Sequence, residues 1–220
     1  MDATATPTAE MALASYSEAL ASEAPTPGGG SVAAVAASLA AALASMVVRV
    51  SQDRAAYQAH AGLHEEALAK SEATRRRCLA LADEDAAAFN AYLAARRLPR
   101  EPRDRAIERA AAIRDAARTA TNVPLAIVQE CHRLAELIER LAGRTNTHAS
   151  SDLDVAALLL DAAARGAAAN AVANLDAVAD AGFSDAVLAE LDQRIRQTQK
   201  ASARTREQVR KHRQRRPEAA

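Results

Sequence analysis

The sequence predicts an all-α protein, a single-domain bundle of long antiparallel helices. Alanine dominates the 220 residues, aromatic residues make up only 2% of them, and no segment alternates valine, isoleucine and threonine with polar residues as a strand would. Apolar side chains instead recur at helical spacing along most of the chain. Because this length suits one sizeable core, we assign residues 1–220 to one domain, with 1–9 and about 205–220 as flexible tails.

The helices are predicted in order from their apolar periodicity and from the residues that separate them. The second one is apolar on most sides and should lie at the centre of the fold. Leu98 to Pro102 breaks the chain, Pro124 suits the first turn of a helix, and Gly182 to Asp185 provides a stop followed by a cap. The expected helices cover residues 11–22, 31–50, 54–95, 102–121, 123–142, 151–181 with a potential break near Gly166, and 184 toward the C-terminus.

Charge, cysteine content and hydropathy argue against several classes of protein. The chain carries 28 basic and 28 acidic side chains, so no global field favours nucleic acid or a membrane as partner. Cys78 and Cys131 are the two cysteines and neither stands at zinc-binding spacing, so we expect no disulfide framework and no metal. The N-terminus lacks the pattern of an export signal, and we expect no uncharged stretch long enough to span a bilayer. These features predict a cytoplasmic protein.

Two further features bear on partners. Alanine-rich helices bury little area per residue, which predicts association with a second subunit. Residues 200–216 carry many basic side chains against a single acid, Glu207. Such a stretch is typical of a solvated helix end, and an anion-binding arm is the alternative.

The stretch from Pro25 to Ser31, Pro-Thr-Pro-Gly-Gly-Gly-Ser, is the first site-like feature because it leads directly into an apolar helix. A glycine run at a helix N-terminus lets other groups approach the backbone closely and points unpaired N–H groups at them. The alternative is a linker that ends in a serine N-cap. The glycines alone leave both interpretations open.

Asp85 is the second site-like feature because it stands in an apolar helical stripe. Cys78, Leu81, Asp85, Phe89 and Tyr92 are spaced three, four, four and three residues apart, so they share one face. Desolvation on such a face raises the pKa of a carboxyl group toward the range where it exchanges protons near neutral pH, and an adjacent cation lowers it again. The alternative is a buried acid that an arginine or a helix end satisfies.

A third set of polar residues lies around a predicted helix start. Ser151 or Asp152 should cap the helix that follows, and capping alone is enough to explain them. Asn170 and Asn174 lie four residues apart on one face of that helix, among alanines. Their amides suit either a ligand or an interhelical hydrogen bond, and the second is the commoner role.

Together these features resemble one family, the folate-dependent cyclodeaminases and methenyltetrahydrofolate cyclohydrolases, which includes the C-terminal domain of formiminotransferase-cyclodeaminase. The resemblance covers nearly the whole chain, with seven motifs in register. They are Pro25 to Ser31 with the helix through Val47, Lys70 to Arg76, Asp85 to Phe89, Leu98-Pro99, Ala120 to Leu125, Ser151-Asp152 with Val155-Ala156, and Gly166-Ala167 with Asn170 and Asn174-Leu175.

The resemblance implies an all-helical homodimer whose substrate is a tetrahydrofolate derivative, with no covalently bound cofactor. Family members act on the one-carbon unit that bridges N5 and N10. A cyclohydrolase adds water to the methenyl carbon and gives 10-formyltetrahydrofolate, whereas a cyclodeaminase closes a formimino group onto N10 and releases ammonia. Because the chain has no formiminotransferase domain, cyclohydrolase is the favoured activity and cyclodeaminase the alternative.

The resemblance also assigns roles to residues. Asp85 would exchange a proton beside the cationic one-carbon centre, and the glycine run would form the backbone wall of a folate pocket. The residues implied to bind substrate are Gly28, Gly29, Gly30, Ser31, Ser151, Asp152, Asn170 and Asn174.

The chain departs from the family pattern after the first core helix. The family carries a glycine, two or three basic residues and an aromatic residue there, whereas this chain reads Asp53-Arg54-Ala55-Ala56-Tyr57. Arg54 is the remaining basic residue and is assigned to substrate binding, with Arg75 to Arg77 as the alternative for contacting a glutamate tail. The departure keeps a third alternative open, a non-catalytic ligand-binding or structural dimer of the same fold.

Overall fold

The computed structural model describes residues 6–214, and their side chains through residue 211. Every regular element in this range is helical, which confirms the predicted all-α class. The α-helices are α1 (Leu13–Leu20), α2 (Gly29–Gln52), α3 (Ala61–Arg96), α4 (Arg103–Leu141), α5 (Ser150–Val178) and α6 (Ala181–Gln214). Three short 3-10 helices join them, η1 (Thr8–Glu10), η2 (Ala55–His60) and η3 (Thr147–Ala149).

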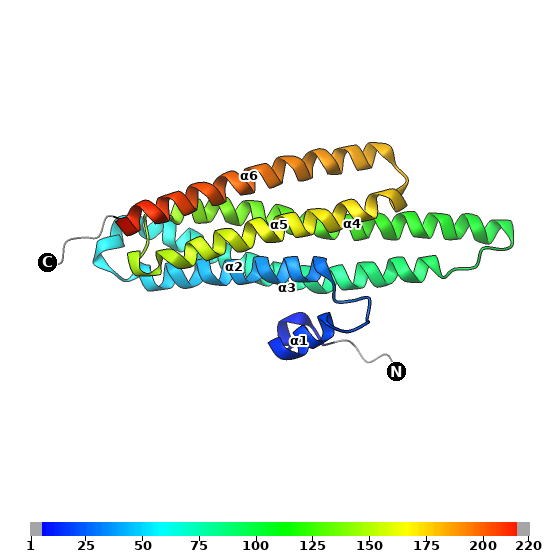
Figure 1. The fold of residues 1–220 in the computed structure, drawn as a ribbon, viewed down its shortest axis with the longest axis horizontal. Helices are drawn as coiled ribbons and strands as arrows, with labels where there is room; N and C mark the ends of the chain where they lie inside the picture. The colour runs from blue at the N-terminus through cyan, green and yellow to red at the C-terminus, as the bar shows by residue number, and fades with distance from the viewer. Residues whose placement is uncertain (1–5, 215–220) are drawn as a thin grey trace.

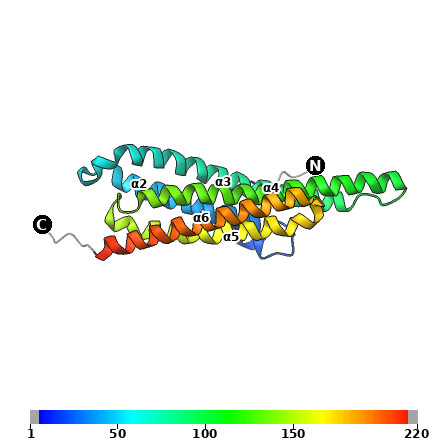
Figure 2. The same ribbon diagram turned by 90° about the horizontal axis from the view of Figure 1, so that it is seen from above.

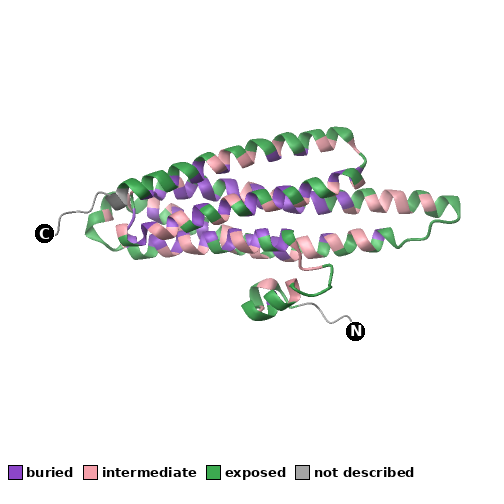
Figure 3. Cartoon of the chain, viewed as in Figure 1, coloured by how far each residue is buried: buried purple, intermediate pink, exposed green. Residues whose placement is uncertain are grey.

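Helices α2 to α6 form an elongated antiparallel bundle (Figure 1). Helix α2 packs against α3 and α5, and α4 packs against α3, α5 and α6. The hairpin of α3 and α4 extends beyond the ends of the other helices (Figure 2). Buried residues run along the inside of the bundle, whereas α1 lies outside it beside the start of α2 and is largely exposed (Figure 3).

Helix α2 is the apolar central helix that its sequence predicts. Its inner positions are mostly alanine and fully buried, so neighbouring helices approach it closely. The expectation that the chain has no uncharged stretch of bilayer-spanning length is wrong, because residues 29–48 carry no charge. By length and composition α2 and the segment Thr147–Val178 could each cross a membrane, as core helices of soluble proteins also could. In α2, 61% of the apolar window is buried within the fold.

Helix α4 is one continuous helix, whereas the sequence predicts two that meet near Pro124. A proline inside a helix has no N–H and therefore releases the carbonyl group four residues earlier, here that of Ala120. The Asn174 side chain of α5 fills this gap, because its Nδ2 donates to the Ala120 carbonyl oxygen at 2.8 Å. A tertiary hydrogen bond thus lets the helix continue through the proline.

Two predicted caps and one predicted break are also wrong. Helix α5 begins at Ser150 after an N-cap residue, Ala149, without a side-chain hydrogen bond, so neither Ser151 nor Asp152 caps it. It continues through Gly166 and ends before Ala179, whose φ is 51°. Asp180 then caps α6, since its Oδ1 accepts from the Phe183 backbone N–H at 3.0 Å, and this replaces the cap expected at residues 184–185.

Most of the described residues in both predicted tails belong to helical elements. Helix α6 continues past residue 205 because Thr205 and Val209 are buried against the bundle. Near the N-terminus, Thr8 begins η1 and its backbone N–H donates to Asp83 Oδ1 at 2.9 Å. Residues 1–5 and 215–220, which belong to the same predicted tails, lie outside the described residues.

Candidate functional site

Asp85 of α3 packs directly against the first turn of α2. A Cβ atom at residue 30 would come within 2.5 Å of the Asp85 carboxyl carbon, a distance that real Cβ contacts essentially never show. Any side chain at this position would therefore displace the carboxyl group from the place it occupies. The backbone N–H of Ser31 also donates to Asp85. The glycine run thus performs the close-approach role rather than that of a linker, and Ser31 lies inside the helix instead of capping it.

The environment of Asp85 raises the pKa of its carboxyl group. Desolvation of the half-buried side chain is the dominant cause, and the hydrogen bond from the Ser31 backbone partly opposes it. Among the described residues Asp85 forms no ion pair with a cation. Burial therefore raises the pKa of Asp85 and the helix end lowers it, as the sequence allows, and the effect of burial is the larger. Such a group can accept and donate protons nearer to neutral pH than an ordinary aspartate.

Asn170 of α5 borders the same helix start. A Cβ atom at Gly29 would lie 3.2 Å from Asn170 Nδ2, which itself donates to the Gly166 carbonyl oxygen at 2.8 Å. Asn174 lies one turn further along, and its amino group is engaged by the carbonyl groups of Ala120 and Asn170. The structure therefore brings Asp85, the glycine run and Asn170 together, and it gives Asn174 the interhelical hydrogen bond that the sequence allows.

Arg54, Ser151 and Asp152 lie at the opposite end of α2. There the Asn146 backbone N–H donates to Ser51 Oγ at 2.8 Å and ties the start of α5 to the end of α2. At 1.5 Å per residue, the stretch of α2 from the glycine run to that end is about 30 Å long. Arg54 is exposed in the turn before η2. Within one chain these three residues therefore do not share a site with Asp85.

Tyr16 is a neighbour of the site that the sequence pattern does not predict. Its hydroxyl group lies 2.9 Å from Ser31 Oγ in a buried contact. It is the buried residue of α1, whose other side chains are partly or fully exposed. A single aromatic residue in a short helix is the available signal, but periodicity over eight residues is too short to show what the residue faces.

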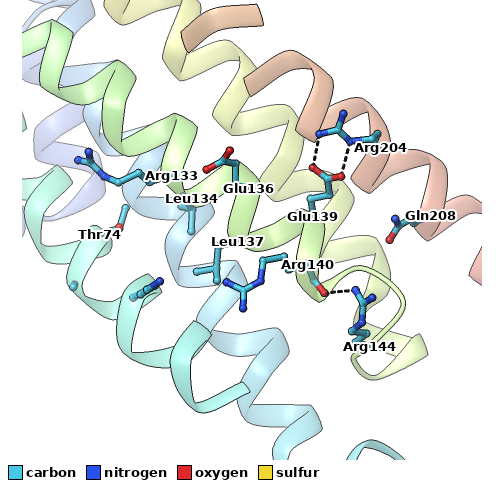
Figure 4. Close-up of a pocket in the computed structure, with 12 residues that line it drawn as sticks. Thr74, Arg133, Leu134, Glu136, Leu137, Glu139, Arg140, Arg144, Arg204 and Gln208 are labelled. Carbon is cyan, nitrogen blue, oxygen red and sulfur yellow. Dashed lines mark hydrogen bonds and ion pairs between the residues drawn. The ribbon is translucent and has the colours of Figure 1, made fainter. Parts of the chain in front are cut away.

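The chain also has a cavity of about 760 Å³ between α3, α4 and α6, remote from Asp85 (Figure 4). Most of its basic side chains are paired with acids, and Arg144 donates to the Arg140 carbonyl oxygen at 2.7 Å. Arg204 forms two hydrogen bonds with Glu139, at 2.5 and 2.8 Å, and Lys70 and Arg140 both bind Glu66. We therefore interpret this cavity as a solvated ion-paired surface. No group of three or more metal-ligating side chains occurs among residues that the structure describes.

The family model for formiminotransferase-cyclodeaminase matches residues 12–193 of the chain. The chain belongs to this family. The matched range contains the glycine run, Asp85, Asn170 and Tyr16, so the geometry around Asp85 lies wholly inside the family domain. The resemblance that the motifs indicate is thereby confirmed.

Individual relatives support the same assignment. The chain is 36% identical to the methenyltetrahydrofolate cyclohydrolase of Methylorubrum extorquens over 180 residues, which cover 82% of this chain and 86% of that protein. It is 36% identical to the formimidoyltransferase-cyclodeaminase of Sus scrofa over 83% of this chain, but it spans only 33% of that longer protein. Among solved structures, the formiminotetrahydrofolate cyclodeaminase of Thermotoga maritima matches with a TM-score of 0.84 and 26% identity, over 92% of this chain and 98% of that one.

Proposed function

We propose that the protein is a 5,10-methenyltetrahydrofolate cyclohydrolase that produces 10-formyltetrahydrofolate. The observation that carries this proposal is the match to the Methylorubrum extorquens cyclohydrolase along most of both chains. The mammalian bifunctional relatives match over only a third of their length. Such a reaction needs a proton-transfer group. The carboxyl group of Asp85, which packs against the start of α2 and has a raised pKa, is suited to this role.

The proposed chemistry follows from the position of Asp85. Water adds to the cationic methenyl carbon, and the Asp85 carboxylate accepts one of its protons as the C–O bond forms. The carbon–N5 bond then breaks, Asp85 returns the proton to N5, and the remaining hydroxyl proton leaves to solvent as the formyl C=O forms on N10. One water is consumed and one proton is released. The Ser31 backbone N–H holds the carboxyl group in place through both steps.

Cyclodeaminase activity is the second candidate, and the named Thermotoga maritima structure favours it. A formimino group that closes onto N10 and expels ammonia needs a proton delivered to the departing nitrogen. Asp85 could donate that proton by the same geometry. The non-catalytic alternative predicts that neither substrate turns over.

One assay separates these alternatives. Purified protein is mixed with 5,10-methenyltetrahydrofolate in a buffer of low general-base activity, and the near-ultraviolet absorbance of the methenyl group is followed beside buffer alone and beside Asp85→Asn. We expect acceleration by the wild type and loss of it in the variant. Decay at the buffer rate would contradict cyclohydrolase activity. Ammonia released from 5-formiminotetrahydrofolate would move the assignment to cyclodeaminase.

We further infer that the protein acts as a homodimer, paired through α2 and α5. These helices lie side by side, as Gly166 against Ala33 shows, and each leaves apolar side chains exposed. Burial of such side chains against an identical surface would be favourable. The exposed side chains are Val32, Leu39 and Val50 on α2 and Val155, Leu158 and Val172 on α5.

In the proposed dimer, the two α2 helices would pack antiparallel. This arrangement would bring the Arg54 end of one subunit toward the Gly30 end of the other. Ser151 and Asp152, which lie about 30 Å from Asp85 within one chain by helix rise, would then approach the second Asp85. The substrate-binding residues implied by the family resemblance would form one pocket between two subunits.

A further inference from the structure

The N-terminal segment, residues 8–20, reaches the candidate site from outside the bundle. Elements η1 and α1 lie apart from the five long helices, next to the start of α2 (Figure 1). Leu13 of α1 is 79% exposed, whereas Tyr16 is 7% exposed. The segment therefore offers the bundle one buried side chain rather than an apolar face.

Two sets of polar contacts hold this segment against α2 and α3 near Asp85. Tyr16 Oη lies 2.9 Å from Ser31 Oγ, and the backbone N–H of Ser31 donates to Asp85. Thr8 donates to Asp83 Oδ1 through its backbone N–H at 2.9 Å and its hydroxyl at 2.5 Å. Asp83 stands two residues before Asp85 on α3. The segment thus spans the place where α2 and α3 meet.

The hydroxyl groups of Tyr16 and Ser31 together carry one hydrogen that their mutual hydrogen bond does not use. The two groups have two hydrogens between them, and their mutual hydrogen bond uses one. Neither hydroxyl forms another hydrogen bond with the residues that the structure describes. Burial, and to a lesser degree the charges of Asp85 and Asp83, raise the pKa of Tyr16, while Ser31 lowers it. Tyr16 therefore stays protonated at neutral pH.

We propose that Tyr16 is a positioning residue for Asp85: its hydroxyl holds Ser31, whose backbone N–H binds the carboxyl group, and its ring closes one side of the site to water. This inference rests on the proposed function for the role of Asp85 in turnover. Either hydroxyl can donate in their mutual hydrogen bond, and in both cases the contact fixes Ser31, whose backbone N–H binds the carboxylate. The aromatic ring of Tyr16 keeps water from the buried contact and so maintains the desolvation of Asp85.

Few ionisable groups lie close enough to Tyr16 and Asp85 to affect their pKa values. Asp85 and Asp83 face the site from α3 and Tyr16 faces it from α1. The first turns of α2 contain no ionisable side chain, and Asn170 of α5 is neutral. A change in the pKa of Asp85 after substitution of Tyr16 would therefore report on water access and on the hydroxyl pair.

The first experiment needs no substrate. The pKa of Asp85 is measured by NMR with ¹³C-carboxyl-labelled aspartate in the full chain, and the Asp85→Asn variant assigns the resonance. We expect Tyr16→Ala to lower the pKa of Asp85 by at least about half a unit, because water reaches the carboxyl group. Thr198→Val is the control, since it removes a buried hydroxyl hydrogen bond in α6 and should leave the pKa unchanged. An unchanged pKa in Tyr16→Ala would overturn the proposal.

The second experiment uses turnover of methenyltetrahydrofolate. Tyr16→Phe keeps the ring and removes the hydroxyl, so we expect kcat to fall about 10-fold while KM stays within about twofold. The lower limb of its pH profile should remain near that of the wild type, whereas Tyr16→Ala should shift that limb downward. Wild-type kinetics in Tyr16→Phe would overturn the positioning role. Absence of wild-type turnover would contradict the proposed function, and the NMR titration would still decide the effect of Tyr16 on Asp85.

Discussion

Gly30 of α2 and Asp85 of α3 are in such close contact that a methyl group on residue 30 would come within 2.5 Å of the carboxyl carbon. Gly30→Ala must therefore displace Asp85 and weaken its hydrogen bond from the Ser31 backbone. We expect cyclohydrolase turnover to fall by about 100-fold, the effect of misplacing a reacting group by about 1 Å. The absorbance assay measures this loss.

Gly62→Ala is the matched control for this substitution. Gly62 lies in the first turn of α3, and a Cβ atom there meets nothing within 4 Å. The variant should keep full activity and gain about 0.5–1 kcal/mol of stability, because alanine loses less backbone entropy than glycine in a helix. Equal activity of the two variants would show that the contact between Gly30 and Asp85 does not matter for turnover.

Replacing Asp85 by asparagine should stabilise the fold at neutral pH while it abolishes turnover. Burial raises the pKa of Asp85 above the ordinary value of 3.8, so the folded state holds its proton more tightly than the unfolded state. As pH rises from below 3.8 through the raised pKa, the wild type therefore loses stability. Asparagine does not ionise and avoids this loss.

Thermal unfolding at several pH values checks the sign of this effect. The Tm of Asp85→Asn should exceed that of the wild type at pH 7, and the difference should vanish near pH 3, where both side chains are neutral. A Tm difference that grows on acidification would contradict the assigned direction of the pKa shift. Circular dichroism verifies that the variant retains its helices.

Asn174 and Pro124 should be energetically coupled. Asn174→Ala leaves the Ala120 carbonyl group, released by Pro124, without its partner, so we expect a loss of about 1–3 kcal/mol. In a Pro124→Ala background, residue 124 regains its N–H and can bond that carbonyl within the helix. Asn174→Ala should then cost less than about 1 kcal/mol.

Chemical denaturation of the four proteins gives the coupling free energy. Asn170→Ala is the control, because its amino group bonds Gly166 within the same helix and is independent of Pro124. Its cost should be equal in both backgrounds. If Asn174→Ala costs the same in both backgrounds, the side chain does not compensate for the proline.

The same coupling shows why the sequence predicts some features of this fold and not others. Helical periodicity extends over many residues and gives the all-α class, the central position of α2 and the half-buried stripe that contains Asp85. Whether a helix continues through Pro124 depends instead on Asn174, which lies 50 residues further along the chain. Local propensity cannot contain that information.

The candidate site shows the same limit. The spacing around Asp85 predicts that it lies on a buried face, and the glycine run allows a close approach, because both follow from local geometry; the structure decides between the alternatives that the sequence leaves open at each. Tyr16 was missed because its partner Ser31 lies in another helix. Arg54 and Ser151 were grouped with Asp85 by motif alone, whereas the fold of one chain places them at the other end of α2.

Leu39 should be decisive for the proposed dimer. It is 54% exposed in the middle of the α2 face, where a partner α2 would cover it. Leu39→Lys places a charge in that interface, and an unpaired charge is costly to bury. We expect the wild type to sediment as a dimer in analytical ultracentrifugation and the variant to shift to a monomer.

Leu98→Lys is the matched control, because Leu98 is 42% exposed in the loop between α3 and α4, away from α2 and α5. It should leave the dimer intact. If the pocket lies between subunits, Leu39→Lys should lose turnover in parallel with dimerisation and regain part of it at high protein concentration, because mass action restores the pairs. A monomeric variant with full activity would place the whole site within one chain, and a monomeric wild type would contradict the dimer itself.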